Sequence, residues 1–331
     1  MHPTARRLAL LSVPVLTVAG AVLPAARGAA APVPGTITRS AAAGPRPAVH
    51  EAADTTTEQR TVRKFWTVAR MEAAEPLDVP GTGDRHFAAA ITGARVSSRT
   101  SGSSWTAGGT VAKTTGRVFF TVTAGPDAGR NASCSGTAVT SANKSVVITA
   151  GHCVKLNGAF HANWVFVPGY DRGDRPDGTW PAATLLTTSQ WNSGENMDYD
   201  VAAAVVAPQG GRSLTDAVGG QGVAFNRPRG RQTYAFGYPA GGQYDGSRLV
   251  YCGGRTFDDF LGSQDQGLSC GMTGGASGGP WFADFDPSTG TGVLTSVNSF
   301  KYGFAPSWMF GPYFGAEAEA VYNAAQKTSL T

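Results

Sequence analysis

The sequence predicts an all-β protein. Glycine accounts for 44 of the 331 residues, and charged residues make up only 15%, whereas soluble proteins average about 7% glycine and about 25% charged residues. Abundant glycine is typical of a chain with many tight turns. With so few charged residues, the chain cannot form many helices with a charged, exposed face. Both features favour strands joined by short turns.

Short runs of β-branched and aromatic residues recur after residue 116, separated by Gly, Pro, Asn and Asp. This spacing is typical of a β-sandwich or a pair of barrels. The runs cover residues 117–122, 135–139, 145–150, 163–167, 201–206, 232–238 and 292–300. The alanine-rich stretch from Ala316 to Gln326 breaks the pattern, and we predict a short helix there.

The N-terminus resembles a secretory signal. Arg6 and Arg7 precede the apolar run Leu8–Leu23, and small residues follow up to Ala31. The alternative is a membrane anchor, but the run contains Pro14 and is shorter than the roughly 20 apolar residues that a spanning helix needs. We therefore expect residues 1–31 to be a signal peptide and the product to be exported.

Residues 32–116 are expected to form a pro-segment. The stretch 32–56 is rich in Ala, Pro, Gly and Thr and is typical of a linker. Apolar residues at helical spacing in 58–75 predict one amphipathic helix, which we expect to pack on the following domain or on a partner. A domain spanning 117–331 would then begin at the first strand-like run.

Cysteine use agrees with export, and the charge balance gives no sign of a nucleic-acid partner. The chain as a whole has a net charge of +4, but residues 117–331 contain 14 Lys and Arg against 16 Asp and Glu, so nothing indicates a nucleic-acid surface. The four cysteines form two local pairs without a C-x-x-C motif, which argues against zinc or thioredoxin-like chemistry.

The segment TGGASGGPW, from Thr273 to Trp281, is the strongest candidate for a nucleophile. A catalytic hydroxyl needs a tight turn whose backbone N–H groups point toward the developing oxyanion, and glycines permit that close approach. The pattern G-x-S-x-G also occurs around Ser269. Because Ser269 adjoins Cys270, we assign it a structural role and select Ser277 as the nucleophile.

Histidine is scarce, and only His152 and His161 follow the leader. His152 ends the apolar run VVITAGHC, so a strand would deliver it directly to a site. His161 lies in the polar stretch NGAFHANW and is assigned to the surface or to packing. We select His152 as the general base.

An acid must orient the imidazole and stabilise its charged form. Asp198 and Asp200 both precede the apolar run that follows MDYD. Asp200 borders that run directly, so its carboxylate can be buried and directed inward. We favour Asp200 and keep Asp198 as the alternative.

The order of these residues along the chain separates two classes of hydrolase. In α/β-hydrolases the order is Ser, acid, His, but no His follows Ser277 or Ser269. The order His152, Asp200, Ser277 is that of chymotrypsin-type peptidases.

The motifs TAGHC, D-V-A and G-x-SGGP resemble the three active-site motifs of the trypsin/chymotrypsin-like serine peptidase family. The resemblance covers residues 117–325 and is greatest to secreted bacterial members near the glutamyl-endopeptidase group. It implies two six-stranded antiparallel β-barrels with the site between them, and an oxyanion hole formed by the N–H groups of Gly275 and Ser277. It also implies the disulfides Cys134–Cys153 and Cys252–Cys270.

Three positions depart from familiar members of the family. Ala276 stands where many have Asp, so activation through an ion pair between that Asp and a new amino terminus is not expected. Gly271 occupies the position at the floor of the specificity pocket, and the strand Thr295–Ser299 lacks the His of glutamyl-specific relatives. We assign the pocket to Gly271, Ser296 and Asn298, and this set supports neither a basic nor an acidic preference.

The resulting hypothesis is a secreted serine endopeptidase made as a zymogen. We expect a monomer that acts on proteins or peptides, with no cofactor and with no nucleic-acid or, after export, membrane partner. The alternative is a secreted binding protein that kept the fold and lost catalysis. Asp171, Asp174 and Asp177 offer two alternatives, a Ca²⁺ site or a solvated acidic loop, and we favour the loop and no bound metal.

Overall fold

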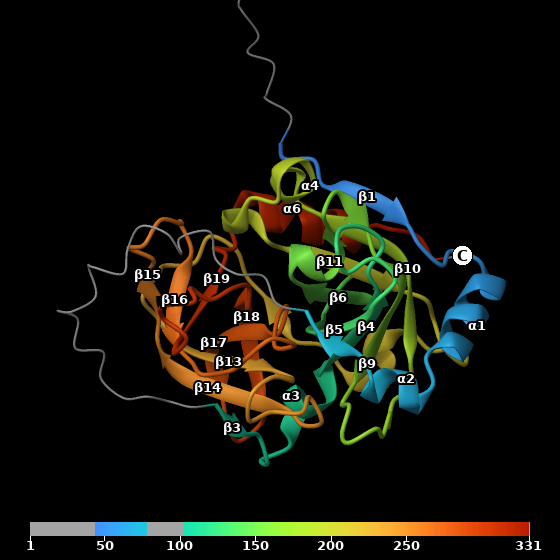
Figure 1. The fold of residues 1–331 in the computed structure, drawn as a ribbon, viewed down its shortest axis with the longest axis horizontal. Coiled ribbons are helices and arrows are strands. Elements are labelled where there is room, and N and C mark those ends of the chain that lie inside the picture. The colour runs from blue at the N-terminus through green and yellow to red at the C-terminus, as the bar shows by residue number, and fades with distance from the viewer. Residues whose placement is uncertain (1–43, 78–101, 331) are drawn as a thin grey trace, which may run out of the picture. The chain divides into compact units, whose positions relative to one another are not determined.

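The computed structural model describes residues 44–77 and 102–330, so the expected signal peptide and residues 32–43 of the expected linker lie outside the described residues. The described chain is mostly β, as expected (Figure 1). Six strands form its first half: β4 (Thr115–Thr121), β5 (Asn131–Val139), β6 (Val146–Thr149), β9 (Ala162–Pro168), β10 (Trp180–Thr187) and β11 (Ala202–Val206).

These six strands form a closed antiparallel barrel. The hydrogen-bonded order is β10-β11-β6-β5-β4-β9, and pairing of β9 with β10 closes the ring. Closure leaves no free edge within the ring and surrounds a core of aliphatic and aromatic side chains such as Val118, Phe120 and Val147, all fully buried. The first of the two expected barrels is therefore confirmed.

The second half consists of two sheets. The larger has the order β12-β18-β17-β13-β14-β3, and the smaller has the order β15-β16-β19. Their bounds are β3 (Ser103–Ser104), β12 (Gly222–Val223), β13 (Gln232–Gly237), β14 (Val250–Arg255), β15 (Phe257–Asp258), β16 (Gln266–Ser269), β17 (Pro280–Asp286), β18 (Thr291–Val297) and β19 (Trp308–Gly311). This arrangement is consistent with a second barrel, whose closure stays a prediction.

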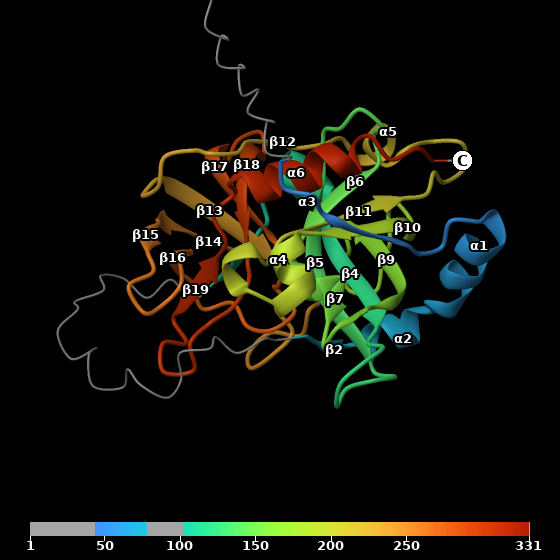
Figure 2. The same ribbon diagram turned by 90° about the horizontal axis from the view of Figure 1, so that it is seen from above.

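Short helices and one hairpin connect these strands. They are α3 (Gly109–Thr114), β7 (Lys155–Leu156), β8 (Ala159–Phe160), α4 (Ser189–Gly194), α5 (Leu214–Val218) and α6 (Ala316–Ala325). Helix α6 confirms the helix predicted near the C-terminus, and it buries Ala318, Val321 and Ala325 (Figure 2). No helix in the described ranges is long and apolar enough to cross a bilayer.

The N-terminal segment packs on the outside of the first barrel, at the right of Figure 1. It contains β1 (Ala48–Glu51), α1 (Thr56–Phe65), α2 (Val68–Glu72) and β2 (Glu75–Pro76). Strand β1 pairs with β10, and β2 pairs with β5. The segment thus extends the barrel's sheet at two places.

The prediction of one continuous helix over 58–75 is wrong, because the structure has two helices, α1 and α2, with a break at Trp66. The Trp66 indole is 1% exposed and donates from Nε1 to the carbonyl of Asn163 at 2.6 Å. Turning the backbone at this point lets the ring reach the barrel. The Thr67 side chain then caps α2 by accepting from the N–H of Arg70 at 3.2 Å.

Residues 102–116 are built into the fold as well. Trp105 packs edge-on against Phe236, Tyr251 and Phe285, with ring centroids 5.2–5.7 Å apart, and Val111 of α3 is fully buried. The expected boundary at residue 117 therefore falls inside the packed structure, and its use as a processing site stays a prediction.

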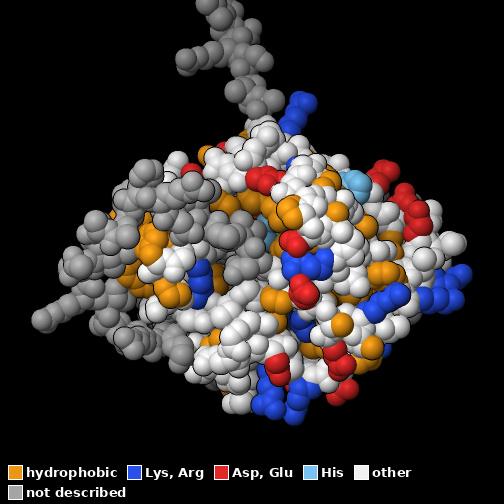
Figure 3. Space-filling model, in the orientation of Figure 1, with side chains coloured by type: hydrophobic (Ala, Val, Ile, Leu, Met, Phe, Trp, Pro, Cys, Tyr) orange, Lys and Arg blue, Asp and Glu red, His pale blue; other side chains and the backbone are white. Residues whose placement is uncertain are grey.

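The surface charges are mixed on the face shown in Figure 3. On the described part of this face, basic and acidic side chains lie next to one another.

Candidate active site

Two neighbouring strands bring His152 and Asp200 together. His152 lies in a single 3-10 turn, Gly151–Cys153, directly after β6. Asp200 ends a second 3-10 turn directly before β11. Because β6 and β11 are antiparallel partners, with Thr149 opposite Ala202, the end of one strand and the start of the other meet at the same edge of the barrel.

The carboxylate of Asp200 holds His152 by two bonds. Asp200 Oδ1 accepts the backbone N–H of His152 at 2.8 Å, and Oδ2 lies 2.8 Å from the imidazole Nδ1. Ser299 Oγ donates to the same Oδ2 at 2.5 Å. His152 and Asp200 are both fully buried. This geometry fixes the position and orientation of the ring.

The same contacts determine the tautomer of His152. A carboxylate oxygen can only accept, so Nδ1 donates to it, and in the neutral imidazole Nε2 then keeps its lone pair. Nε2 of His152 has no hydrogen-bond partner among the described residues. The site therefore presents a buried, oriented nitrogen that can take up a proton.

Ser277 lies on a glycine-rich turn that adjoins this edge. Gly275 and Gly278 have φ of +90° and +76°, which favour glycine over any side chain. A Cβ on Gly278 would lie 2.0 Å from Thr149 Oγ1 and 2.9 Å from the N of Ala150. Only glycine therefore lets the turn approach the chain just before His152.

Hydrogen bonds from the first barrel hold this turn. The Ser277 carbonyl accepts the N–H of Ser135 at 2.7 Å, and Ser135 Oγ donates to the carbonyl of Gly275 at 2.9 Å. From the other side, Asn298 Nδ2 donates to the carbonyl of Ala276 at 2.9 Å. The turn is thus tied to both halves of the molecule.

The apolar surroundings of Ala276 explain why an Asp is absent there. Ala276 is fully buried in a cluster that includes Val250, Leu268, Met272 and Trp281. A carboxylate in this cluster would be buried without a partner and would cost several kcal/mol. Packing and the bonds from Ser135 and Asn298 hold the turn instead.

A stretch of the N-terminal segment runs beside the turn. Strand β2 lies parallel to β5, with Pro76 opposite Ser133. The next residue, Leu77, is 2% exposed. Its N–H donates to the carbonyl of Ser133 at 3.0 Å, and its carbonyl accepts the N–H of Gly275 at 3.4 Å. One of the two N–H groups assigned to the oxyanion hole therefore faces a carbonyl of the chain itself.

The residues predicted for a specificity pocket have different surroundings. Gly271 is partly exposed and follows Cys270 directly. Ser296 is buried and donates to the carbonyl of Pro312 at 2.8 Å. Asn298 is fully buried, and its Oδ1 accepts the indole N–H of Trp281 at 2.7 Å. Since Ser296 and Asn298 have internal partners, a direct substrate contact of either side chain stays a prediction.

The rejected alternatives lie in other settings. Ser269 ends β16, where it pairs with Trp308 of β19. Asp198 is partly exposed, and its Oδ1 accepts the backbone N–H of Gln264 at 2.8 Å. Asp200 is thus the acid that contacts His152 in the structure.

Both expected disulfides are present. Cys134 of β5 is bonded to Cys153, the neighbour of His152, and Cys252 of β14 is bonded to Cys270. The sulfurs of Cys134 and Cys153 lie close to His152 Nδ1 or Nε2, but a disulfide leaves no thiolate to bind a metal.

Asp171, Asp174 and Asp177 do not form a metal-binding group within the described ranges. The carboxylate of Asp171 instead accepts from Arg172 at 3.0 Å through both oxygens.

His161 is buried rather than exposed, and it supports His152. Its ring stacks on Phe120 at 4.3 Å, and its Nε2 donates to the carbonyl of His152 at 2.9 Å. Burial lowers the pKa of His161 from 6.5 to about 4. The imidazole is therefore neutral at neutral pH and acts as a fixed donor behind the site.

This burial predicts a pH-dependent stability. Below pH 6.5 the unfolded chain takes up a proton at His161, whereas the folded chain does so only near pH 4. Stability is then full above 6.5 and falls as the pH drops toward 4, by about 3 kcal/mol. Urea unfolding of the native protein and of His161→Gln, which keeps a donor and cannot titrate, should show a smaller loss in the variant. Equal losses would contradict the assignment.

A further buried carboxyl lies near the site. Asp265 is 1% exposed, and neither of its oxygens has a hydrogen-bond partner among the described residues. Burial, reinforced by the charges of Asp198, Asp200 and Asp259, raises the pKa of Asp265 well above its ordinary value. A neutral Asp265 adds no second negative charge beside Asp200.

A closed antiparallel barrel, with a buried Asp–His pair at its edge and a serine turn beside it, defines the class of serine hydrolases with a chymotrypsin-like fold. Residues 134–286 match the profile of the trypsin-like peptidase domain. These residues contain the three expected motifs. A search of curated proteins gave no match to the chain.

Solved structures give the same result. The chain is 43% identical to the protease Anisep from Arthrobacter nicotinovorans, covering 96% of that chain and 65% of its own at a TM-score of 0.60. It is 41% identical to the thermostable serine protease AL20 from an extremophilic microorganism, covering 100% of that chain and 66% of its own at a TM-score of 0.62. A Glu endopeptidase, at 17% identity and a TM-score of 0.53, shares the fold. The chain belongs to the trypsin-like peptidase family, and its expected enzyme class, serine peptidase, is confirmed.

Sequence reasoning missed several residues around the site. Ser299, the second donor to Asp200 Oδ2, lies in the stretch TSVNS, from which the sequence predicts only Ser296 and Asn298 as site residues. Ser135 and Leu77 gave no local signal, because their roles depend on contacts with Gly275, which lies far from both along the chain.

Proposed function

We propose that the protein is an exported serine endopeptidase with His152, Asp200 and Ser277 as its triad. The observation that carries the proposal is the buried Asp200–His152 pair, in which Nε2 of His152 has no hydrogen-bond partner among the described residues. Two disulfides support export, because such bonds persist in oxidising compartments. A protein or peptide substrate, acted on by a monomer, is part of the proposal.

Each residue has a defined step. Ser277 Oγ attacks the peptide carbonyl and passes its proton to His152 Nε2, and the carbonyl oxygen becomes an oxyanion facing the N–H groups of Gly275 and Ser277. The imidazolium formed is stabilised by Asp200. It then gives the proton to the leaving amine, water replaces the amine, and the acyl-enzyme is hydrolysed by the reverse transfer. Each of the two N–H donors would increase kcat by a factor of about 10²–10³.

The arrangement of Leu77 supports a zymogen. The carbonyl of Leu77 takes the N–H of Gly275, which the oxyanion would need. Strand β2 also occupies the side of β5 that adjoins the turn. In the unprocessed chain, residues 75–77 therefore obstruct the site, and their release is part of activation.

Labelling with a fluorophosphonate tests this proposal and its alternative, an inactive binding protein. We expect the reagent to label Ser277 in the processed protein, as mapped by mass spectrometry, and to label the precursor much more slowly. The processed protein should also cut a peptide library. Absence of labelling and of cleavage in a folded, processed protein would favour the binding protein, and labelling at Ser269 would overturn the assignment of the nucleophile.

A further inference from the structure

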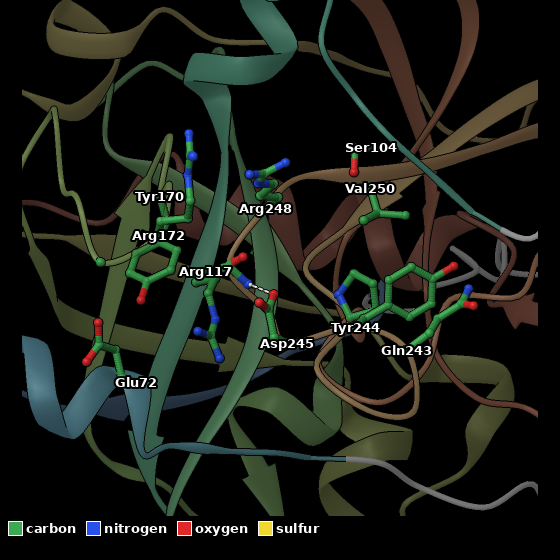
Figure 4. Close-up of a pocket in the computed structure, with 13 residues that line it drawn as sticks. Glu72, Ser104, Arg117, Tyr170, Arg172, Gln243, Tyr244, Asp245, Arg248 and Val250 are labelled. Atoms are coloured by element: carbon green, nitrogen blue, oxygen red, sulfur yellow. Dashed lines mark hydrogen bonds between the residues drawn. The ribbon is translucent and has the colours of Figure 1, made fainter.

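A pocket of about 540 Å³ is lined by three arginines, Arg117, Arg172 and Arg248 (Figure 4). Arg117 of β4 lies at its centre in Figure 4, and Glu72 of α2 lies at one side. Most of the remaining wall comes from the loop after β9, with Tyr170 and Arg172, and from the loop between β13 and β14, with Asp245 and Arg248.

Two contacts place this pocket on the leaving-group side of the site. Arg117 Nη2 donates to Ser133 Oγ at 2.8 Å. Cys134, the neighbour of Ser133, is bonded to Cys153, which adjoins the histidine that would protonate the leaving amine. On the far wall, the N–H of Ala240 donates to the carbonyl of Gly274, within the nucleophile turn, at 2.8 Å.

The position of Leu77 indicates how far from the scissile bond a substrate would reach the pocket. This single residue spans from the carbonyl of Ser133 to the N–H of Gly275, so the two groups are about one residue apart. Leu77 runs toward Gly275, whereas the leaving-group side of a substrate runs away from it. Because the pocket lies on the leaving-group side, a substrate whose reacting carbonyl faces Gly275 would pass Ser133 with one of its first two residues after the scissile bond. The side chain of Ser133 is bonded to Arg117, so that residue lies next to the guanidinium.

Arg117 is a buried cation without a carboxylate partner. It is 3% exposed, and its guanidinium carbon lies 4.6 Å from the ring of Phe119 and 5.1 Å from that of Tyr170. Among the described residues it forms no ion pair within 4.0 Å, and its Nε has no hydrogen-bond partner. Buried charges in proteins are normally paired, so this arrangement suits an incoming anion.

Among the described residues, the other charges around the pocket form no ion pair with Arg117, and the carboxylate of Asp245 acts on its guanidinium from beyond 4.0 Å. Arg172 is bonded to Asp171 through two nitrogens, at 3.0 Å each. Asp245 accepts the N–H of Ser247 at 2.9 Å. Glu72 belongs to the N-terminal segment and lines the same pocket, so the segment that obstructs the site also brings a carboxylate to this place.

We propose that this pocket selects substrates with an acidic side chain, Asp or Glu, at one of the first two residues after the scissile bond, and that Arg117 determines this preference. The proposal rests on the proposed peptidase function and deepens it. A guanidinium and a carboxylate form strong, charge-assisted hydrogen bonds, and removal from water strengthens them further. Glu and Gln have nearly the same shape, so their comparison isolates the charge.

The test uses the processed native enzyme and a peptide whose cleavage site has been mapped. Glu and Gln are placed in turn at the first, second and third residues after that site, and kcat/KM is measured for each. We expect Glu to exceed Gln by about tenfold at one of the first two positions. Equal rates at both would overturn the proposal, while failure to cut any peptide would count against the peptidase function itself.

Variants then test the assignment to Arg117. Arg117→Met keeps an apolar stem against Phe119 and Tyr170, and it should abolish the Glu preference while the Gln peptide is still cut. Arg212→Gln removes an exposed charge outside the pocket, and it should leave the preference unchanged. A preference that survives in Arg117→Met would overturn the role of Arg117. If that variant does not fold, the comparison in the native enzyme still decides whether the pocket selects acidic residues.

Discussion

Replacing Ser277 by Ala is expected to lower kcat by a factor on the order of 10⁶. Ser277 carries the hydroxyl of the glycine-rich turn, which hydrogen bonds from Ser135 and Asn298 hold in place. Because Gly278 has no side chain, this turn can lie close to the chain just before His152. The variant keeps the N–H groups proposed for the oxyanion hole, so some catalysis over water should remain. Hydrolysis of a good peptide substrate at saturating concentration measures the loss.

The matched control is Ser269→Ala. Ser269 belongs to the same type of G-x-S-x-G pattern but lies in β16, paired with β19, so kcat should change by less than about threefold. Both variants must be brought to the native N-terminus with an added protease, so that failed self-processing is not mistaken for lost chemistry. A folded Ser269→Ala protein without activity, beside an active Ser277→Ala protein, would contradict the assignment.

The proposed triad could be selected from the sequence because its signals are local. His152 and Asp200 each border an apolar run, and Ser277 lies among glycines. The two runs form β6 and β11, which bring His152 and Asp200 to one edge of the barrel, and the glycines form the turn before β17. The strands and the C-terminal helix could be predicted for the same reason, because the spacing of apolar residues and the turn residues that bound each segment can be read from neighbouring positions.

The N-terminal segment was harder to predict because its form depends on the surface that it covers. The apolar spacing over 58–75 indicates one helix, but burial of Trp66 against the barrel ends α1 after Phe65. Leu77 carries no motif, and its contact with Gly275 joins positions that local patterns cannot relate.

Arg117 illustrates the same limit. In the sequence it is one basic residue in a strand-like run, and its burial beside Ser133 becomes visible only when β4 and β5 are paired. Asn298 illustrates the opposite case, in which a sequence position indicates a site residue but the side chain has internal partners. Its position along the chain predicts a pocket residue, and its Nδ2 donates to the carbonyls of Phe236 and Ala276.

Asp200→Asn is expected to lower kcat by about 10⁴ while leaving the fold intact. Asp200 offers acceptors to three donors: the N–H and Nδ1–H of His152 and the Oγ–H of Ser299. An amide keeps one accepting oxygen, which can still take the backbone N–H of His152. Its NH₂ group then faces Nδ1 and can only donate, so the imidazole adopts the tautomer with the proton on Nε2.

That tautomer cannot accept the proton of Ser277, which is why the loss should fall on kcat. Asp198→Asn is the matched control, because within the described ranges Asp198 Oδ1 accepts only the N–H of Gln264, and an amide oxygen can replace the carboxylate oxygen. We expect that variant to retain kcat within about threefold. Circular dichroism and thermal unfolding should first show that both variants are folded, and kcat is then measured on one peptide. If the two folded variants lost activity equally, the contact between Asp200 and His152 would not explain the catalytic role of the acid, and the choice of Asp200 over Asp198 would be wrong.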